Sequence, residues 1–471
     1  MNSNHPCGSD PAQRYLSGQL RQAILQPGFE PSRAGSVPHV DALTPSERAE
    51  YIRRGVQLVR SGRVAFSILA AGAASRMDPA ELPPQVQHLL KRSGLLQLPA
   101  GKALVPVLEH AGTVWTYLDL FLVNVARFLK QLDAAAPVLL FVSSANRDET
   151  CRYLAERPYE LPEPIWYLEQ PLARAFVARL EDARAAERNF PSEEFPQVLE
   201  YSRQNAGQYL PCEKPAGHGE FLHQLVASGM AGQLAGRGIR YVAVRNIDNV
   251  AALVDERWLA ALGYLDLHQA DLLAEVSQRP LGQKGGALIR RNERWLLAED
   301  PSFTGSTYSA RDSYYINNAV AILDLSLLGK LYETSVEELL RWNDRPLPER
   351  TAALQRLAER GRSRFPTLVD PKPFRLPNGR LVAAVVPETN MWESTLADDR
   401  VRLLPWAVDS DQDAGADLLS LPQPEQERRI LRVRFCPVKT WADYLDPRKQ
   451  MITHRLARRI LDERLVEPPV P

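Results

Sequence analysis

Apolar and polar residues follow two patterns along the first 270 residues, and each pattern predicts a different element. Short apolar, β-prone runs predict buried strands, whereas longer amphipathic stretches predict helices. Thr44, Pro45 and Glu47 form the cap, the first position and the third position of the first long helix. The expected strands are 64–70, 138–142, 166–168 and 240–245, and the expected helices are 45–60, 116–130, 172–188 and 219–234.

The alternation of these strands and helices predicts the fold class. It is typical of an α/β protein with a largely parallel or mixed sheet that helices cover on both faces. After residue 270 the strand-like runs 272–277, 286–291, 295–298 and 314–323 follow one another with few helices between them, which predicts antiparallel additions to the sheet. We expect an N-terminal segment 1–60 with a helix, an α/β domain 61–385 that contains an insertion at 78–101, and a small C-terminal domain 386–471.

Composition and charge narrow the function class. The chain has 471 residues, of which 45% are hydrophobic and 24% are charged, an ordinary globular balance. The 57 basic and 57 acidic residues cancel, so the basic excess of a general nucleic-acid or anionic-membrane binder is missing. We therefore expect neither nucleic acid nor membrane as a partner, while anionic small-molecule substrates remain compatible.

The basic residues and the cysteines add two points. Only nine of the 57 basic residues are lysines, which makes each lysine more informative about a point-charge role. The four cysteines form no C-x-x-C pair, so the sequence gives no zinc-finger or thioredoxin-like signal. No basic-then-apolar signal pattern and no apolar run of about 18 residues is present, which predicts a soluble, cytoplasmic protein.

Three short segments suit phosphate or nucleotide binding. Small residues follow the first expected strand, from Ala71 and Gly72 to Arg76, and they allow backbone N–H groups to approach phosphate oxygens. Lys102 follows Gly101 and offers a second cation, although a surface lysine is an equally good interpretation from its position alone. The segment 215–220 places Gly217, His218 and Gly219 directly before an expected helix, where backbone amides suit an anion.

A fourth segment ends the expected strand 240–245 in a cluster of amides and carboxylates. Asn246, Asp248 and Asn249 follow this strand directly. In open α/β sheets ligands lie outside the carboxyl ends of the strands, and Mg²⁺ prefers a carboxylate together with waters and substrate phosphates. Asp248 is therefore a candidate Mg²⁺ ligand; the alternative is an aspartate that caps the following turn.

These segments, taken in order, resemble the motifs of the UDP-glucose pyrophosphorylase family, the UTP–glucose-1-phosphate uridylyltransferases. The loop after the first strand is similar to its L-A-G-G/A-x-G-T-R-M/L loop, with Ala74 in place of a glycine. Segment 215–220 resembles P-P-G-H-G-D, and 238–255 resembles G-x-x-Y-I-x-x-x-N-I-D-N-L-G-A-x-x-D. Further resemblances follow at Lys284-Gly285-Gly286, Glu299, Tyr315-Ile316-Asn317-Asn318, Asp370-Pro371-Lys372, Glu388-Thr389 and Arg434-Phe435-Cys436-Pro437-Val438-Lys439-Thr440.

The resemblance implies a Rossmann-like (GT-A-like) nucleotidyltransferase fold and a reaction in which UTP and a sugar 1-phosphate give a UDP-sugar and pyrophosphate. It implies Mg²⁺ as cofactor, held by Asp248, and Arg76 and Lys102 as the cations on the triphosphate. Lys439, helped by Lys372, would hold the sugar phosphate. The implied substrate contacts are Ala71 and Gly72 in the triphosphate loop, Gln170 at the uracil, Gly217, His218, Gly219 and Asn246 at the nucleotide and phosphates, and Gly285, Gly286, Glu299, Asn317 and Asn318 at the sugar.

Three alternatives remain open. The Pro-Val-Lys-Thr segment at 437–440 favours glucose 1-phosphate, but N-acetylglucosamine 1-phosphate and galactose 1-phosphate are possible substrates. The replaced glycines at Ala74 and Ala251 leave room for a non-catalytic UDP-sugar-binding homologue. A nicotinamide-dependent oxidoreductase is disfavoured because no strand is followed by G-x-G-x-x-G.

Overall fold

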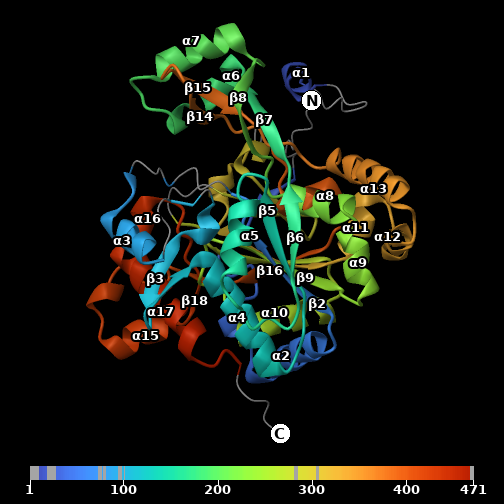
Figure 1. Cartoon of the computed structure of the whole chain (residues 1–471), viewed down its shortest axis with the longest axis vertical. Coiled ribbons are helices and arrows are strands. Elements are labelled where there is room, and N and C mark those ends of the chain that lie inside the picture. Colours follow the sequence, from blue (N-terminus) through green and yellow to red (C-terminus); the bar gives the residue numbers. More distant parts are fainter. Residues whose placement is uncertain are drawn as a thin grey trace.

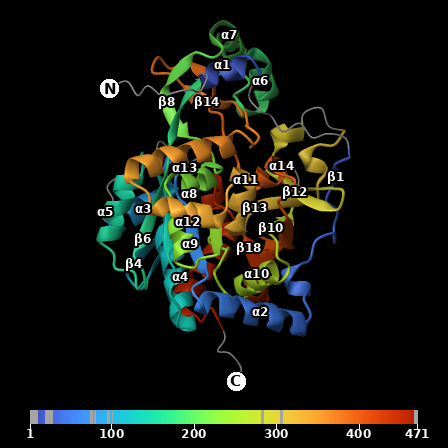
Figure 2. The ribbon, with the colours of Figure 1, turned by 90° about the vertical axis from the view of Figure 1, so that its right-hand side faces the viewer.

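The computed structural model describes residues 10–18, 28–72, 77, 81–93, 98–99, 101–280, 285–303 and 307–466. Helices pack on both faces of a large central sheet, and a smaller lobe stands at one end of the molecule (Figures 1 and 2). Arg76, Ala74 and Lys284 lie outside the described residues. The predicted mixed α/β fold is confirmed.

Four parallel strands form one half of the central sheet, in the order β9-β2-β5-β6. These strands are β2 (Val64–Leu69), β5 (Val138–Ser143), β6 (Ile165–Gln170) and β9 (Tyr241–Asn246). Every residue of β2 and of β5 is buried. Such burial on both faces explains why these strands are continuous apolar runs in the sequence.

The other half of the sheet is mostly antiparallel, as the pattern after residue 270 predicts. The long strand β13 (Tyr315–Asp324) runs antiparallel to β9 and to β10 (Leu272–Gln278), and β16 (Leu403–Ala407) lies parallel to β10. A branch starts at the beginning of β13, where β11 pairs with it through Ala287 and Ile316. The branch consists of β11 (Ala287–Arg291), β12 (Arg294–Ala298) and β1 (Glu30–Pro31).

Two groups of helices cover the two faces, because alternate residues of each buried strand point to opposite sides. Leu140 of β5 belongs to the hydrophobic core on one face of the sheet, and the next residue, Phe141, belongs to the core on the other face. The first face carries α2 (Pro45–Arg60), α4 (Tyr117–Leu132), α10 (Glu256–Leu267) and α17 (Pro447–Asp462). The second face carries α8 (Glu220–Ala227), α9 (Met230–Gly236), α11 (Ser326–Tyr332), α12 (Val336–Asn343) and α13 (Leu347–Arg362).

Local signals explain several element boundaries. Helix α2 begins with the predicted capping box, in which Thr44 Oγ1 accepts from the Glu47 N–H and the Glu47 carboxylate accepts from the Thr44 N–H. The single helix expected over 219–234 is instead divided at Gly229, which has a φ of +76° that favours glycine. The remaining elements of the main body are α3 (Pro84–Ser93), β3 (Pro106–His110), β4 (Thr113–Thr116), α5 (Arg147–Ala155), α14 (Ser394–Ala397), β17 (Asp409–Ser410), α15 (Gln423–Ile430), β18 (Val433–Phe435) and α16 (Trp441–Leu445).

The smaller lobe combines three segments that are far apart in the sequence, 11–16, 172–215 and 372–385. Its four-stranded antiparallel sheet has the order β14-β15-β7-β8. Short helices lie beside this sheet at the top of Figure 1, and buried side chains from them pack on it. The lobe contains α1 (Pro11–Leu16), β7 (Leu172–Val177), α6 (Leu180–Ala185), α7 (Phe195–Asn205), β8 (Tyr209–Pro215), β14 (Lys372–Arg375) and β15 (Leu381–Val385).

The prediction of one helix over 172–188 is wrong. The first part of this range is strand β7, and only Leu180–Ala185 is helical. Alanine and arginine favour a helix, but β7 pairs with β8 and β15 and buries Phe176 and Val177 in two different hydrophobic clusters of the lobe. Tertiary pairing therefore overrides the local preference. Among the described residues, no helix combines the length and apolar character that crossing a membrane requires.

Candidate functional site

Most of the expected site residues lie at one edge of the central sheet. Leu69 at the end of β2 pairs with Asn246 at the end of β9, and Ser143 at the end of β5 pairs with Gln170 at the end of β6. The four parallel strands therefore end at the same edge, with Gly72 a few residues beyond β2. This edge is where open α/β sheets bind ligands.

The loop after β2 is fixed at its start by the loop after β5. The Asn146 side chain donates to the Ala70 carbonyl at 2.8 Å, and the Ser143 hydroxyl donates to the Ala71 carbonyl at 3.1 Å. Gly101 packs on the same asparagine, since a Cβ there would lie 2.6 Å from its Nδ2. Ala71 is buried while Gly72 is exposed, as a loop that presents its backbone to a ligand requires. Asn146 is a positioning residue that the motifs do not reveal.

Lys102 and Asp248, which are far apart in the sequence, form an ion pair. Lys102 Nζ donates to Asp248 Oδ2 at 3.1 Å and to the Val438 and Lys439 carbonyls at 3.2 and 3.5 Å. Each of the two side chains is only 13% exposed. The Val438 N–H donates to the Asp248 carbonyl at 3.0 Å. The structure thus joins one predicted cation, the predicted metal ligand and the backbone at Lys439 in one bonded group.

The donor atoms near Asp248 fit a magnesium ion that shares its coordination with phosphates. The Asn246 Oδ1 atom is buried and accepts no hydrogen bond. No group of three or more His, Cys, Asp or Glu side chains suited to a metal occurs in the described ranges. Mg²⁺ is often held by one or two carboxylates together with waters and substrate phosphates, so the single Asp248 carboxylate fits, and the unbonded Asn246 oxygen two residues earlier in the chain is a further candidate donor.

The Gly217-His218-Gly219 turn packs closely on residues 388–389 at the base of the lobe. The Gly219 N–H donates to the Thr389 carbonyl at 2.9 Å, and a Cβ on Gly219 would lie 2.3 Å from Thr389 Oγ1. Gly217 has a φ of +89°, and a Cβ there would lie 2.6 Å from the Thr389 carbonyl oxygen. Gln170 Nε2 donates to the Gly217 carbonyl at 2.6 Å. Close backbone packing therefore explains both glycines, and it holds the turn at the sheet edge.

His218 lies among four charged groups that the sequence places in different segments. Burial lowers the pKa of His218, so it is neutral at neutral pH, and the charges that act on it come from Glu388, Asp248, Lys372 and Lys439. Lys372 itself is 40% exposed and donates to Glu388 at 2.7 Å. The lobe and the sheet edge thus face a common site.

The predicted sugar-contact residues Gly286, Glu299 and Asn317 lie together. A Cβ on Gly286 would be 2.8 Å from Glu299 Oε1 and 3.5 Å from the Asn317 Cβ. Asn390 Nδ2 donates to Glu299 Oε1 at 2.9 Å, and the Glu299 N–H donates to Glu393 Oε1 at 3.0 Å. Asn390 and Glu393 carry no motif signal in the sequence, and only the fold brings them to this group.

Glu299 is an unusual acid. Burial, together with the negative charges of Glu393 and Asp300, raises its pKa to about 8, while Lys439 acts in the opposite direction. Glu299 is therefore mostly protonated at neutral pH, and its carboxyl group can donate a hydrogen bond as well as accept one. A neutral carboxyl suits contact with sugar hydroxyls beside an anionic phosphate.

The structure does not bring Asn318 into this group. Asn318 is 2% exposed and accepts from the Ser277 hydroxyl at 2.8 Å. The register of β13 against β10 shifts after Asn317, and Ala319 has a φ of +55°, so the two asparagines are distinguished by their contacts: Asn317 lies beside Gly286 and Asn318 against Ser277. Gly285 next to Gly286 has a φ of +146°, and its carbonyl accepts from Arg279 at 3.3 Å, which fixes Gly285 itself.

Comparison with known proteins agrees with these motifs. The family model described as UTP–glucose-1-phosphate uridylyltransferase matches residues 188–332, a range that contains the His218 turn, Asp248 and Glu299. The enzyme of that name from Solanum tuberosum is 25% identical over 233 residues, which are 47% of this chain and 43% of the relative. The Encephalitozoon cuniculi enzyme is 33% identical over 108 residues, 22% of this chain and 21% of that relative. The chain thus spans less than half the length of the curated relatives it matches.

Solved structures confirm the predicted fold over most of the chain. A UDP-glucose phosphorylase from Trypanosoma brucei superposes with a TM-score of 0.55 at 19% identity, covering 93% of this chain and 73% of that one. A Leishmania major UDP-glucose pyrophosphorylase in complex with UDP-glucose gives a TM-score of 0.54 at 17% identity, with 92% and 73% covered. A T. brucei UDP-N-acetylglucosamine pyrophosphorylase gives 0.53 at 15% identity, with 94% and 74% covered. The predicted resemblance is confirmed.

Proposed function

We propose that this protein is a uridylyltransferase that converts UTP and a sugar 1-phosphate into a UDP-sugar and pyrophosphate, with glucose 1-phosphate as the first candidate. The observation that carries the proposal is the bonded group of Lys102, Asp248 and the Lys439 backbone at the sheet edge. The names of the relatives point the same way.

The chemistry requires two polyanions to meet, and the site offers the charges for it. A phosphate oxygen of the sugar phosphate attacks the α-phosphorus of UTP in line with the leaving pyrophosphate, so no side chain acts as nucleophile. The protein aligns the reactants and offsets their repulsion. Lys102 and Arg76 serve the triphosphate, and Lys439 with Lys372 serves the sugar phosphate. Asp248, with Asn246 as a second candidate ligand, would hold Mg²⁺, which would neutralise phosphate charge.

On the other side of the site, neutral hydrogen-bonding groups suit the sugar ring. We assign Gly286, protonated Glu299 and Asn317 to the sugar hydroxyls, and Asn390 to the orientation of Glu299, to which it donates. The Gly217-His218-Gly219 turn and Gln170 would hold the uridine side. A cytoplasmic location is part of the proposal, and cell fractionation tests it.

A pyrophosphate-release assay with the purified protein tests the function directly. UTP, Mg²⁺ and one of glucose 1-phosphate, N-acetylglucosamine 1-phosphate or galactose 1-phosphate are supplied in separate reactions. We expect release with glucose 1-phosphate. Release with another sugar only would correct the substrate, and binding of UDP-glucose without release from any sugar would favour a non-catalytic UDP-sugar-binding protein.

A further inference from the structure

The segment that carries Lys439 runs from strand β18 to helix α16, and its residues 436–440 form no regular structure. We call residues 434–440 the Lys439 strap; it leaves β18 at Phe435 and reaches α16 only after Thr440. Asn249 donates to the Arg434 carbonyl at 3.0 Å and accepts from the Cys436 N–H at 3.0 Å. The strap therefore lies along the Asp248-Asn249 segment, and beyond Phe435, which still pairs with β17, it is held by individual hydrogen bonds rather than by a sheet.

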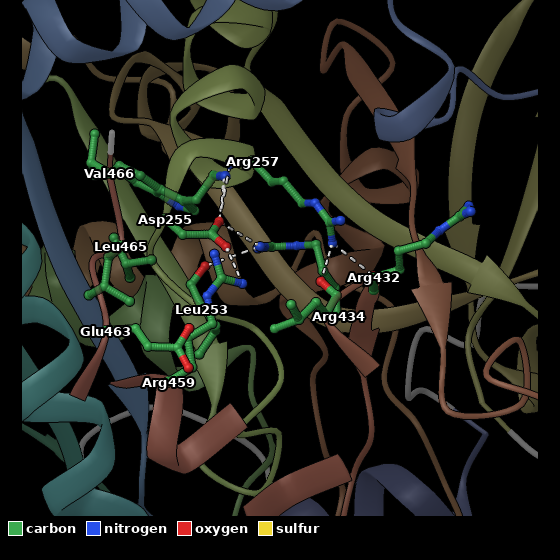
Figure 3. A network of polar contacts seen from close by, with 12 residues as sticks. Leu253, Asp255, Arg257, Arg432, Arg434, Arg459, Glu463, Leu465 and Val466 are labelled. Carbon is green, nitrogen blue, oxygen red and sulfur yellow. Dashed lines mark hydrogen bonds and ion pairs between the residues drawn. The ribbon is translucent and has the colours of Figure 1, made fainter. Parts of the chain in front are cut away.

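The first residue of the strap is anchored by its side chain in the protein interior. Arg434 is 2% exposed, and its guanidinium donates to Glu275 Oε1 through Nε and Nη2 at 3.0 and 2.6 Å. Its Nη1 donates to Asp255 Oδ1 at 3.1 Å and to the Leu253 carbonyl at 3.2 Å. Figure 3 shows Arg434, Asp255 and Leu253 in this arrangement. One side chain thus joins the strap to β10 and to the end of the Asp248 segment.

Asp255 links this anchor to two helices. Its Oδ1 accepts from the Arg257 and Trp258 backbone N–H groups at 3.1 and 3.3 Å and so caps α10. Its Oδ2 lies 3.6 Å from Nη1 of Arg459 on α17, which approaches it in Figure 3. The guanidinium of Arg434 is therefore held on one side by a carboxylate, that of Asp255, which is itself fixed.

The energetics argue that the anchor serves geometry more than stability. A buried ion pair recovers little more than the desolvation of its charges, and apolar residues of similar volume often stabilise a protein as well or better. A planar guanidinium fork, in contrast, fixes direction as well as distance. Arg434 makes four hydrogen bonds to three residues, so it restricts where the strap can begin.

We propose that Arg434, held by Glu275 and Asp255, is a positioning residue that sets Lys439 at the reacting phosphates. The inference rests on the proposed function. Arg434 acts through the strap, whose Val438 N–H is bonded to the Asp248 carbonyl and whose carbonyls accept from Lys102. Displacing the strap therefore moves Lys439 relative to Asp248 and Lys102.

A double-mutant cycle tests this coupling. Arg434→Lys keeps the charge but loses the fork, and we expect kcat to fall about 10- to 100-fold, the scale of a misplacement near 1 Å. In a Lys439→Ala background the same change should cost less than about twofold, because the positioned group is absent. Multiplicative effects in the double variant would overturn the inference. Arg432→Lys is the matched control: Arg432 lies two residues before the strap, its side chain is 51% exposed and bonded to Asp409, and kcat should be unchanged.

A second variant and a second readout keep the inference independent of folding and of turnover. Glu275→Gln retains the volume and should reproduce the kcat loss in weaker form even where Arg434→Lys does not fold. Amide hydrogen exchange at Cys436 and Val438 should be faster in Arg434→Lys, or in Glu275→Gln if only that variant folds, and unchanged in Arg432→Lys. Unchanged exchange in the folded test variant would overturn the inference. An inactive wild type would instead count against the proposed function. The double-mutant cycle would then be carried out with the affinity for UDP-glucose as the measured quantity.

Discussion

The two sides of the site differ in how they treat charge. On one side Lys102 and Asp248 are partly buried ions that pair with each other and with the backbone of the Lys439 strap. On the other side Glu299, with a pKa of about 8, is mostly neutral at pH 7 and is bonded to the Asn390 amide. The charged side suits phosphates, and the neutral side suits hydroxyls. Substitutions on the two sides should therefore fail in different ways.

The largest effect is expected from Lys439 on the charged side. Lys439→Ala should lower kcat/KM about 100-fold or more, because one preorganised charge at the developing negative charge is lost. Steady-state kinetics with saturating UTP would measure it. Lys130→Ala is the control, since Lys130 pairs with Glu160 on the surface with 72% of its side chain exposed. A loss below about threefold, far from the scale of a preorganised charge contact, would remove Lys439 from the mechanism.

Asp248→Asn should act on the metal rather than on the fold. The Mg²⁺ concentration for half-maximal rate should rise about tenfold or more, the scale seen when metal-site partners are removed. The thermal unfolding midpoint should change little, because the Asp248 carbonyl still accepts from Val438. Asp462→Asn, an exposed carboxylate paired with His110, is the control. An unchanged Mg²⁺ titration would contradict the metal role.

The charged side could be predicted from sequence, and the neutral side only in part. Asp248 follows a buried apolar strand, and Lys439 lies in a motif, so both were identifiable from local pattern. The contacts that hold the Lys439 strap could not be identified in this way. Arg434 is bonded to Glu275 and Asp255, which are 159 and 179 positions away in the sequence. No periodicity records such distant contacts, which arise when the strap folds back on the sheet edge.

The same limit applies to the small lobe and to the sugar side. Strand β7 has a helix-favouring composition, and only its pairing with β8 and β15 makes it a strand. In the sequence, Asn390 and Glu393 are ordinary polar residues after β15. Only the fold shows that both are hydrogen-bonded to Glu299. The alternation of apolar runs predicts the main sheet, because that sheet is buried on both faces, whereas long-range pairing decides the lobe.

Glu299 gives the neutral side a pH dependence. Its pKa of about 8 means that the carboxyl loses its proton as the pH rises through 8, which places a negative charge beside the sugar phosphate. We expect the wild-type kcat/KM to fall about tenfold at one pH unit above this pKa. Glu299→Gln, which stays neutral, should be close to wild type at pH 7 and lack this fall. A pH profile that keeps the same fall in Glu299→Gln would assign it to another group.

Stability supplies an independent readout of the same titration. In the unfolded chain the Glu299 pKa is near 4.3, so between about pH 4 and pH 8 only the folded protein retains the proton. The folded state is therefore favoured at the acid end of this window, and this contribution is lost as the pH rises toward 8. The unfolding midpoint of Glu299→Gln should decline less over the window than that of the wild type.

The smallest expected effect distinguishes two adjacent asparagines on β13. Asn317→Ala should raise the KM for the sugar phosphate about 3- to 10-fold, the scale of one neutral hydrogen bond, because Asn317 lies beside Gly286 and Glu299. Asn318→Ala should leave that KM unchanged. It should instead lower the free energy of unfolding by about 1–2 kcal/mol, because the buried side-chain oxygen Oδ1 that accepts from the Ser277 hydroxyl is lost. Kinetics and denaturant unfolding of both variants would separate the two roles. A KM effect at Asn318 that equals the effect at Asn317 would mean that β13 twists enough to present both amides to the sugar, and the division between a charged side and a neutral side would then extend across the sheet.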